Sequence, residues 1–233
     1  MPLKFPIDKF HFRSNSIFEG LPESELNFLE ERMIEIKIKK GQSVFNEGTS
    51  PNGIFYIRKG KIKKYKTNRE GKEQIIYICS EGELLGYPAL ISDEPYSDSA
   101  TAIEDTVVGF ISKADFLQLL DESKALSKKL LVNLSHEFGV LINGMASFAR
   151  KSVRERLSLC LLIMKDKYQS SSDETSPVEI NLSREDLANF VGVAVETLVR
   201  LLHDFKEEGL IETQGRKKRI LDSKKLIKVA NFY

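Results

Sequence analysis

The chain has 233 residues, of which 41% are hydrophobic, and its formal net charge at pH 7 is +1. This length and apolar content suit one large or two modest globular domains, and the charge neither indicates nor excludes a nucleic-acid partner. The two cysteines lie far apart without a CxxC pair, which argues against a zinc or iron–sulfur framework. No stretch approaches roughly eighteen apolar residues, and residues 1–13 lack the apolar run of a signal peptide, so no membrane partner and a cytoplasmic location are expected.

The first predicted helix follows Pro22 and turns Leu26 and Leu29 inward. From residue 34 to residue 111, short runs rich in Ile, Val, Phe and Tyr alternate with glycines, and residues 68–71 suit a hairpin turn. Short strands at this spacing predict an antiparallel sandwich or barrel. Ser112 is expected to cap the helix that follows.

A long helix without proline is predicted from Ala125 to Ala149, followed at once by a second helix, Val153–Lys167. Apolar side chains recur along the long helix at heptad spacing, at Leu134, Phe138, Leu141, Met145 and Phe148. A heptad seam suits a partner helix. A helix packed on the sheet of its own domain would show the same pattern, so both alternatives stay open at this point.

The segment after the polar loop at residues 169–177 predicts two helices joined by a short turn. Ser183 and Asp186 form a capping box at the start of the first helix, and Gly192 ends it. The second helix is expected from Val195 to Glu208, with Gly209 behind it. Two helices joined by a turn that contains glycine are typical of a helix-turn-helix.

The second of these helices has two distinct faces. The apolar face, which is expected to point into the core, consists of Leu198, Leu201, Leu202 and Phe205. The opposite face carries Val195, Glu196, Val199, Arg200 and His203. Arg can bind guanine with two hydrogen bonds and Glu can accept one from cytosine, so this face suits base reading. The alternative is that Glu196 and Arg200, at i and i+4, form only a surface ion pair.

Two short strands around Ile211 and Ile220 complete the pattern, with a turn at Gln214 and Gly215. Four consecutive basic residues follow the turn: Arg216, Lys217, Lys218 and Arg219. Such a run on a hairpin behind a helix-turn-helix is interpreted as a wing, whose charges attract DNA phosphates regardless of sequence.

Over roughly residues 15–225 the chain resembles the cyclic-AMP receptor protein/FNR (Crp/Fnr) family of bacterial transcription regulators. The resemblance is carried by Gly53-Ile-Phe-Tyr-Ile-Arg-Lys-Gly-Lys-Ile, Gly71-Lys-Glu-Gln-Ile-Ile, Gly82-Glu-Leu-Leu-Gly and Val195-Glu-Thr-Leu-Val-Arg. It implies an α+β fold. The expected parts are a double-stranded β-helix that resembles a cyclic-nucleotide-binding jelly roll (1–121), a long dimerisation helix (122–149) and a C-terminal winged helix-turn-helix (150–233).

The resemblance further implies a homodimer, with the heptad positions as its seam, that binds double-stranded DNA at a pseudo-palindromic site. Activation is the habit of the family, and RNA polymerase is a candidate partner, with the loop 169–177 as a candidate contact. The expected base-reading residues are Val195, Glu196, Val199 and Arg200. The expected phosphate contacts are Ser183, Thr197, Arg216, Lys217, Lys218 and Arg219.

The chain departs from the family at the effector pocket. Members that bind cyclic nucleotides place a Glu for the ribose where this chain has Tyr87, and an Arg for the phosphate where it has Ser97 or Asp98. A carboxylate there opposes an anionic ligand, so cyclic AMP is disfavoured. An unknown small-molecule effector and an empty pocket both stay open. The candidate pocket residues are Leu85, Gly86, Tyr87, Pro88, Ser97, Asp98, Ser99, Leu141 and Ile142.

Other functions are less well supported by the sequence. No P-loop, GxSxG or HExxH motif occurs, so no enzyme is expected, and no metal site or cofactor is identified. Cys79 and Cys160 lie in apolar runs and are interpreted as small buried hydrophobic residues. The alternative to a DNA-binding regulator is a ligand-binding module that regulates a protein partner without binding DNA.

Overall fold

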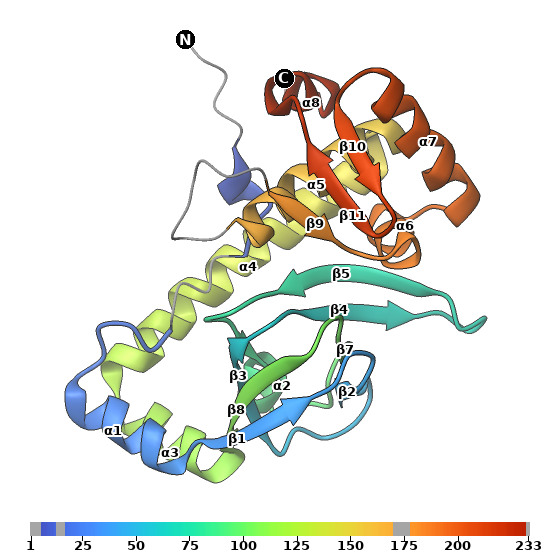
Figure 1. Cartoon of the computed structure of the whole chain (residues 1–233). Helices are drawn as coiled ribbons and strands as arrows, with labels where there is room; N and C mark the ends of the chain where they lie inside the picture. The colour runs from blue at the N-terminus through green and yellow to red at the C-terminus, as the bar shows by residue number, and fades with distance from the viewer. Residues whose placement is uncertain (1–5, 13–16, 170–177, 232–233) are drawn as a thin grey trace. The chain divides into compact units, whose positions relative to one another are not determined.

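The computed structural model describes residues 6–12, 17–169 and 178–231, so most of the polar loop at 169–177 lies outside the described residues. The chain divides into two compact units, residues 12–138 and residues 139–233, and the latter includes the N-terminal segment up to residue 11. Helix α4 (Lys124–Arg150) contributes to both units (Figure 1). Among the described helices, none combines the length and the apolar character that a membrane crossing requires.

The first unit is built on two antiparallel sheets of four strands each (Figure 1). One sheet has the order β1 (Ile34–Ile38), β8 (Thr106–Ser112), β3 (Gly53–Lys59) and β6 (Leu84–Leu85). The other has the order β2 (Ser43–Phe45), β7 (Ser99–Ala102), β4 (Ile62–Thr67) and β5 (Glu73–Cys79). Neighbours in each sheet are mostly distant in sequence, as in a jelly roll. The predicted β-rich sensor-type fold is thereby confirmed, and we call it the β-roll.

Three short helices flank the β-roll: α1 (Glu23–Arg32), α2 (Tyr87–Ser92) and α3 (Lys113–Glu122). As predicted, α1 begins directly after Pro22, and the Ser112 hydroxyl caps α3 by accepting a hydrogen bond from the Asp115 amide at 3.1 Å. Helices α1 and α3 lie side by side, joined by an ion pair of 3.3 Å between Arg32 and Asp115 (Figure 1). Their apolar faces share one core with the sheet, which includes Leu29, Ile54 and Phe116.

One glycine of the β-roll is required by space. A Cβ atom on Gly53 would lie 2.2 Å from the Ile111 carbonyl oxygen of the neighbouring strand, far inside contact distance. The predicted hairpin turn at residues 68–71 is also present, because the Gly71 amide donates to the Asn68 carbonyl at 3.0 Å. Local turn chemistry therefore sets the ends of the strands here.

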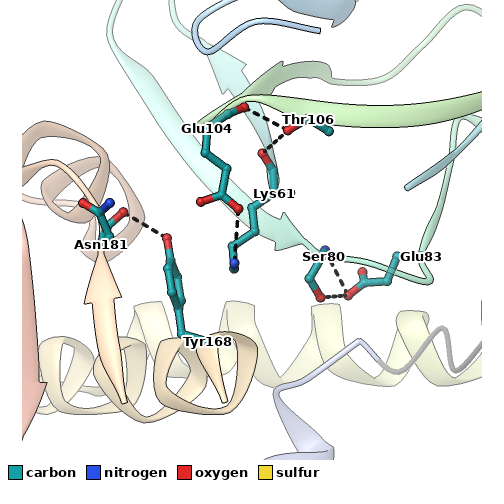
Figure 2. Close-up of polar contacts among 7 residues, drawn as sticks. All are labelled: Lys61, Ser80, Glu83, Glu104, Thr106, Tyr168 and Asn181. Carbon is teal, nitrogen blue, oxygen red and sulfur yellow. Dashed lines mark hydrogen bonds and ion pairs between the residues drawn. The ribbon is translucent and has the colours of Figure 1, made fainter. Parts of the chain in front are cut away.

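The second unit contains helices α5 (Val153–Tyr168), α6 (Arg184–Val191), α7 (Val195–Glu207) and α8 (Ser223–Val229). Its sheet has the order β10 (Ile211–Gln214), β11 (Lys217–Ile220) and β9 (Glu179–Asn181). The Tyr168 hydroxyl, at the end of α5, donates to the Asn181 carbonyl of β9 at 3.0 Å (Figure 2). A 3-10 turn, η1 (Ile7–Lys9), lies in the N-terminal segment. Strand β9, α8 and η1 were not predicted from the sequence.

Local capping explains why α5 begins where the sequence predicts. Ser152 and Glu155 form a full capping box at the start of α5, and the apolar residues beyond it are buried. Cys160, in the middle of α5, and Cys79, in β5, are both buried, as expected. Burial raises the pKa of the Cys160 thiol to about 12, so this thiol stays protonated and unreactive at neutral pH.

Candidate DNA-binding surface and ligand pocket

Helix α6 is fixed at both ends by side-chain and backbone caps. At its start the Ser183 hydroxyl accepts a hydrogen bond from the Asp186 amide at 2.9 Å and donates one to the Asp186 carboxylate. At its end Gly192 adopts φ of 75°, in the left-handed region that glycine favours, and its amide donates to the Ala188 carbonyl. These caps define the helix and turn the chain sharply toward α7.

The turn between α6 and α7 is held by Arg156 of α5. Its Nε donates to the Val191 carbonyl at 3.0 Å, and its Nη2 donates to the Gly192 carbonyl at 3.4 Å. Arg156 was not predicted from the sequence, because nothing in its local pattern reveals a partner 35 residues away. Its charge-assisted hydrogen bonds satisfy carbonyl groups that the end of α6 leaves open, so they fix the angle between the two helices.

Helix α7 divides its side chains as predicted. Leu198, Leu202 and Phe205 are buried and Leu201 is half-buried, while the opposite face is exposed: Val195, Glu196, Val199, Arg200 and His203. Thr197, in the first turn, is half-buried. Within the described part of the chain, no partner for an ion pair of Glu196 or Arg200 lies within reach, so the i,i+4 pair is not formed. Both side chains are therefore available to an external partner.

The four basic residues of the wing fall into three different environments. Arg216, in the turn between β10 and β11, is exposed and makes no ion pair with a described residue. Lys217 and Arg219 both bind Glu179 of β9, at 2.7 Å and 3.1 Å. Arg219 also lies 3.5 Å from Glu212. Carboxylates of the protein itself thus offset the positive charge at two positions of the wing.

Lys218 differs from its three neighbours, because its side chain is 1% exposed. The sequence predicts that all four residues of the basic run contact DNA phosphates. In the structure, residues 217–220 form a strand, so successive side chains point to opposite faces and Lys218 points inward. The position expected to contact phosphate directly is therefore covered by the protein.

The β-roll contains a small, partly open polar cavity of about 30 Å³. Four expected pocket residues line it, Leu85, Gly86, Tyr87 and Pro88, together with Phe12, Lys64, Tyr77, Cys79, Glu83, Leu84 and Glu137. Sites for small organic ligands usually enclose roughly 300–1,000 Å³. A cavity of this size has room for about one water molecule and none for a nucleotide.

Tyr87 fills the place where the resemblance puts a ribose-binding Glu. It is 1% exposed, and its hydroxyl accepts a hydrogen bond of 2.7 Å from the Asn133 amide of α4, which also donates to Glu137 at 2.9 Å. Burial raises the pKa of the Tyr87 phenol well above its ordinary value and also raises the pKa of the Glu137 carboxyl. A neutral phenol tied to α4 thus stands in this position.

The residues expected to hold a phosphate are engaged with the protein itself. Asp98 forms an ion pair of 3.0 Å with Lys64. Burial of Lys64 opposes its charge, but the combined attraction of Asp98, Cys79 and Glu137 outweighs burial and raises the pKa of the ammonium. The Ser99 hydroxyl accepts a hydrogen bond from the Glu47 amide at 3.0 Å, and the backbone carbonyl of Ser97 accepts one from the Lys66 ammonium at 2.9 Å. An anionic ligand would have to displace these contacts.

A third carboxylate, Glu83, adds to the negative charge beside the cavity. It accepts hydrogen bonds from the Ser80 amide at 3.3 Å and from the Ser80 hydroxyl at 3.0 Å (Figure 2). The Tyr77 hydroxyl also donates to it at 3.3 Å. Leu141 and Ile142, which were expected at this pocket, do not line the cavity and are 43% and 50% exposed, because they lie on the outer side of α4.

Comparison with known proteins decides the family. Residues 35–123 match the cyclic nucleotide-binding domain model, and residues 155–229 match the Crp-like helix-turn-helix domain model. Over 211 residues the chain is 30% identical to the anaerobic regulatory protein of Haemophilus influenzae, an alignment that covers 90% of this chain and 81% of that protein. This chain belongs to the Crp/Fnr family of transcription regulators. It is a DNA-binding regulator of the Crp/Fnr type.

Further relatives of this Crp/Fnr regulator agree. It is 28% identical over 193 residues to the transcriptional activator protein anr of Pseudomonas aeruginosa, across 83% of this chain and 79% of the relative. The solved structure of FixK2 from Bradyrhizobium japonicum matches with a TM-score of 0.76 at 20% identity, across 86% of this chain and 98% of that one. The structural likeness supports the fold that the sequence predicted.

The Crp/Fnr regulator exposes an apolar stripe along α4. Phe138 and Met145 are 67% and 74% exposed, and the further exposed apolar side chains of this helix are Leu131, Val132, Leu141, Ile142 and Phe148. Leu134, the first expected seam position, is instead partly buried against the β-roll core. The heptad positions are therefore exposed from Phe138 onward, while Leu134 packs against the core of the β-roll.

Proposed function

We propose that this regulator binds a two-fold symmetric DNA site as a homodimer, with α7 in the major groove and the wing on the phosphate backbone. The observation that carries the proposal is the division of α7, whose apolar side is buried while Glu196 and Arg200 are exposed without ion-pair partners in the described chain. Val195 and Val199 border them and suit contact with thymine methyl groups.

The exposed stripe of α4 supports the homodimer. Large apolar side chains gathered on one face of a helix usually mark an interface, and burial of each such side chain contributes roughly 1.5–3 kcal/mol. Two copies of α4 packed through Phe138, Leu141, Met145 and Phe148 would bury this face and relate the two copies of α7 by a two-fold axis. RNA polymerase is then the proposed partner for activation, because relatives are named transcriptional activators.

Selection from a pool of random duplexes tests the proposed function. Purified full-length protein is expected to enrich a pseudo-palindrome whose half-sites lie about one helical turn apart, since each α7 of the dimer reads one half-site. Enrichment of a single, asymmetric half-site would contradict the homodimer, and a pool without enrichment would contradict sequence-specific binding.

Replacement of Arg216 by Ala is expected to weaken binding to all duplexes to a similar degree. Arg216 is the exposed wing cation without an ion pair in the described chain, so it is placed to neutralise a phosphate. Loss of one phosphate contact should lower the slope of log affinity against log salt concentration by about 1 per half-site. Arg219→Ala is the matched control, because Glu179 and Glu212 already offset its charge, and its effect should be smaller. Equal effects of the two variants would contradict the assignment.

Cyclic AMP is expected to produce no binding heat when titrated into the protein. The cavity of about 30 Å³ is too small, two acidic residues line it, Glu83 and Glu137, and the ammonium of Lys64, which also lines it, is already paired with Asp98. An anionic nucleotide would meet both obstacles. Saturable heat at micromolar cyclic AMP would contradict this interpretation of the pocket.

A further inference from the structure

The ammonium group of Lys218 connects two parts of the DNA-binding surface. Its Nζ donates to the Arg216 carbonyl in the turn of the wing at 2.9 Å and to the Leu182 carbonyl. Leu182 directly precedes Ser183, the capping residue of α6. One buried group therefore joins the wing to the start of the helix-turn-helix.

Among the described residues, none forms an ion pair with the buried ammonium of Lys218. No carboxylate of the described residues lies within ion-pair distance of its ammonium, and both of its hydrogen-bond acceptors are neutral carbonyl groups. A charge that is buried without an opposite charge is costly, because the protein interior does not replace the water that solvates it. An aliphatic side chain at this position would avoid that cost, so the stability of the fold does not account for a lysine here.

The charged groups around Lys218 make its surroundings more positive. Arg184 and Arg216 repel the ammonium, and Asp186 of α6 attracts it more weakly. On β9 and β10, Glu179 and Glu212 are bound to Lys217 and Arg219 instead. Burial, followed by the charges of Arg184 and Arg216, lowers the pKa of Lys218 to about 8. The free protein thus holds the ammonium close to the point at which it loses its proton.

We propose that Lys218 is a positioning residue which holds the wing against the start of α6, and that the phosphates of bound DNA supply a counter-charge to its ammonium. The proposal rests on the DNA-binding mode proposed above, in which Ser183 and Arg216 lie next to the backbone. Lys218 makes no direct phosphate contact in it. The protonated form of Lys218 holds the wing in place, and bound DNA favours that form.

The sign of the resulting pH dependence follows from linkage. DNA phosphates favour the charged form of Lys218, so the bound protein holds the proton to a higher pH than the free protein. Below about pH 7 Lys218 is protonated in both the free and the bound protein, so its titration does not change the affinity for DNA. Above about pH 8 binding must take up a proton, and affinity falls by up to about tenfold per pH unit for each subunit.

The test compares the wild-type protein with Lys218→Arg. The dissociation constant for a selected duplex is measured by fluorescence anisotropy from pH 6.5 to pH 9.5 at constant ionic strength. Calorimetry at pH 8.5 in two buffers of different ionisation enthalpy then counts the protons taken up. Arg keeps the charge at every pH of the experiment, so the variant should bind with an affinity similar to wild type at pH 7 while losing the proton uptake and the fall above pH 8. Lys217→Arg, at the exposed neighbour, is the matched control and should retain both.

Three outcomes overturn the proposal. One is equal proton uptake by the wild type and by Lys218→Arg, since another group would then titrate. Another is the absence of uptake by the wild type at pH 8.5, which needs no variant and so remains decisive even if Lys218→Arg does not fold. The last is a wild type that binds no duplex at any pH, which would overturn the proposed DNA-binding mode together with the proposal.

Discussion

Arg200→Ala is expected to weaken binding to the selected site by roughly 5- to 150-fold per half-site and to relax the preference at one base pair of each half-site. Arg200 is exposed on α7, and in the described chain it has no ion-pair partner, so its guanidinium is free to make two hydrogen bonds to a guanine. A contact of this kind contributes roughly 1–3 kcal/mol of discrimination. Competition binding against duplexes with each substitution at that base pair measures both effects.

Lys206→Ala is the matched control for Arg200→Ala. Lys206 is an exposed cation of the same helix in its last turn, away from the residues expected to read bases. Its loss should leave the order of preferred sequences unchanged. If Arg200→Ala weakened all duplexes equally, Arg200 would be a phosphate contact, and the assignment of base reading would be wrong.

Met145→Asp is expected to convert the proposed homodimer into a monomer and to lower the affinity for the proposed symmetric site by roughly 100-fold or more. Met145 is the most exposed large apolar side chain of α4, at 74%, and an aspartate there would place like charges opposite each other in the proposed seam. A monomer loses the gain from linking two half-sites, which typically amounts to factors of roughly 10²–10⁴. Light scattering after size exclusion gives the oligomeric state, and anisotropy gives the affinity.

Ile34→Asp controls for the general effect of placing a charge on an exposed apolar residue. Ile34 is 62% exposed on β1, an edge strand of the β-roll, and the proposed dimer does not use it. This variant should remain dimeric with unchanged affinity. A Met145→Asp protein that stayed dimeric at the same concentration would show that the seam lies elsewhere.

The helix-turn-helix could be predicted closely because its determinants are local. Ser183 and Asp186 lie three residues apart, Gly192 ends α6 through its own conformation, and the apolar spacing of α7 repeats within a few turns. Helix α4 was likewise placed to within one residue at each end, since it contains no proline and ends before a strong capping residue, Ser152. Caps and apolar spacings that involve residues three or four positions apart can be recognised in a single sequence.

The remaining features depend on contacts between distant segments. Lys64, Asp98 and Glu137 come from β4, from the start of β7 and from α4, and only the folded β-roll brings them to one place. The prediction that Lys218 lies on the surface was wrong for a different reason. Four basic residues in a row do not show which side chains of a strand point inward and which point outward. The inward orientation of Lys218 is fixed by the pairing of β11 with β9, opposite Ile180, and β9 was not predicted.

The exposed face of α7 has a consequence for how such regulators diverge. Glu196 and Arg200 contribute nothing to the buried core, and the caps and Arg156 that orient the helix lie outside this face. Surface substitutions of this kind usually change the free energy of unfolding by no more than about 0.5 kcal/mol. Duplicated genes could therefore acquire new operator preferences through single substitutions at these positions, without passing through unstable intermediates.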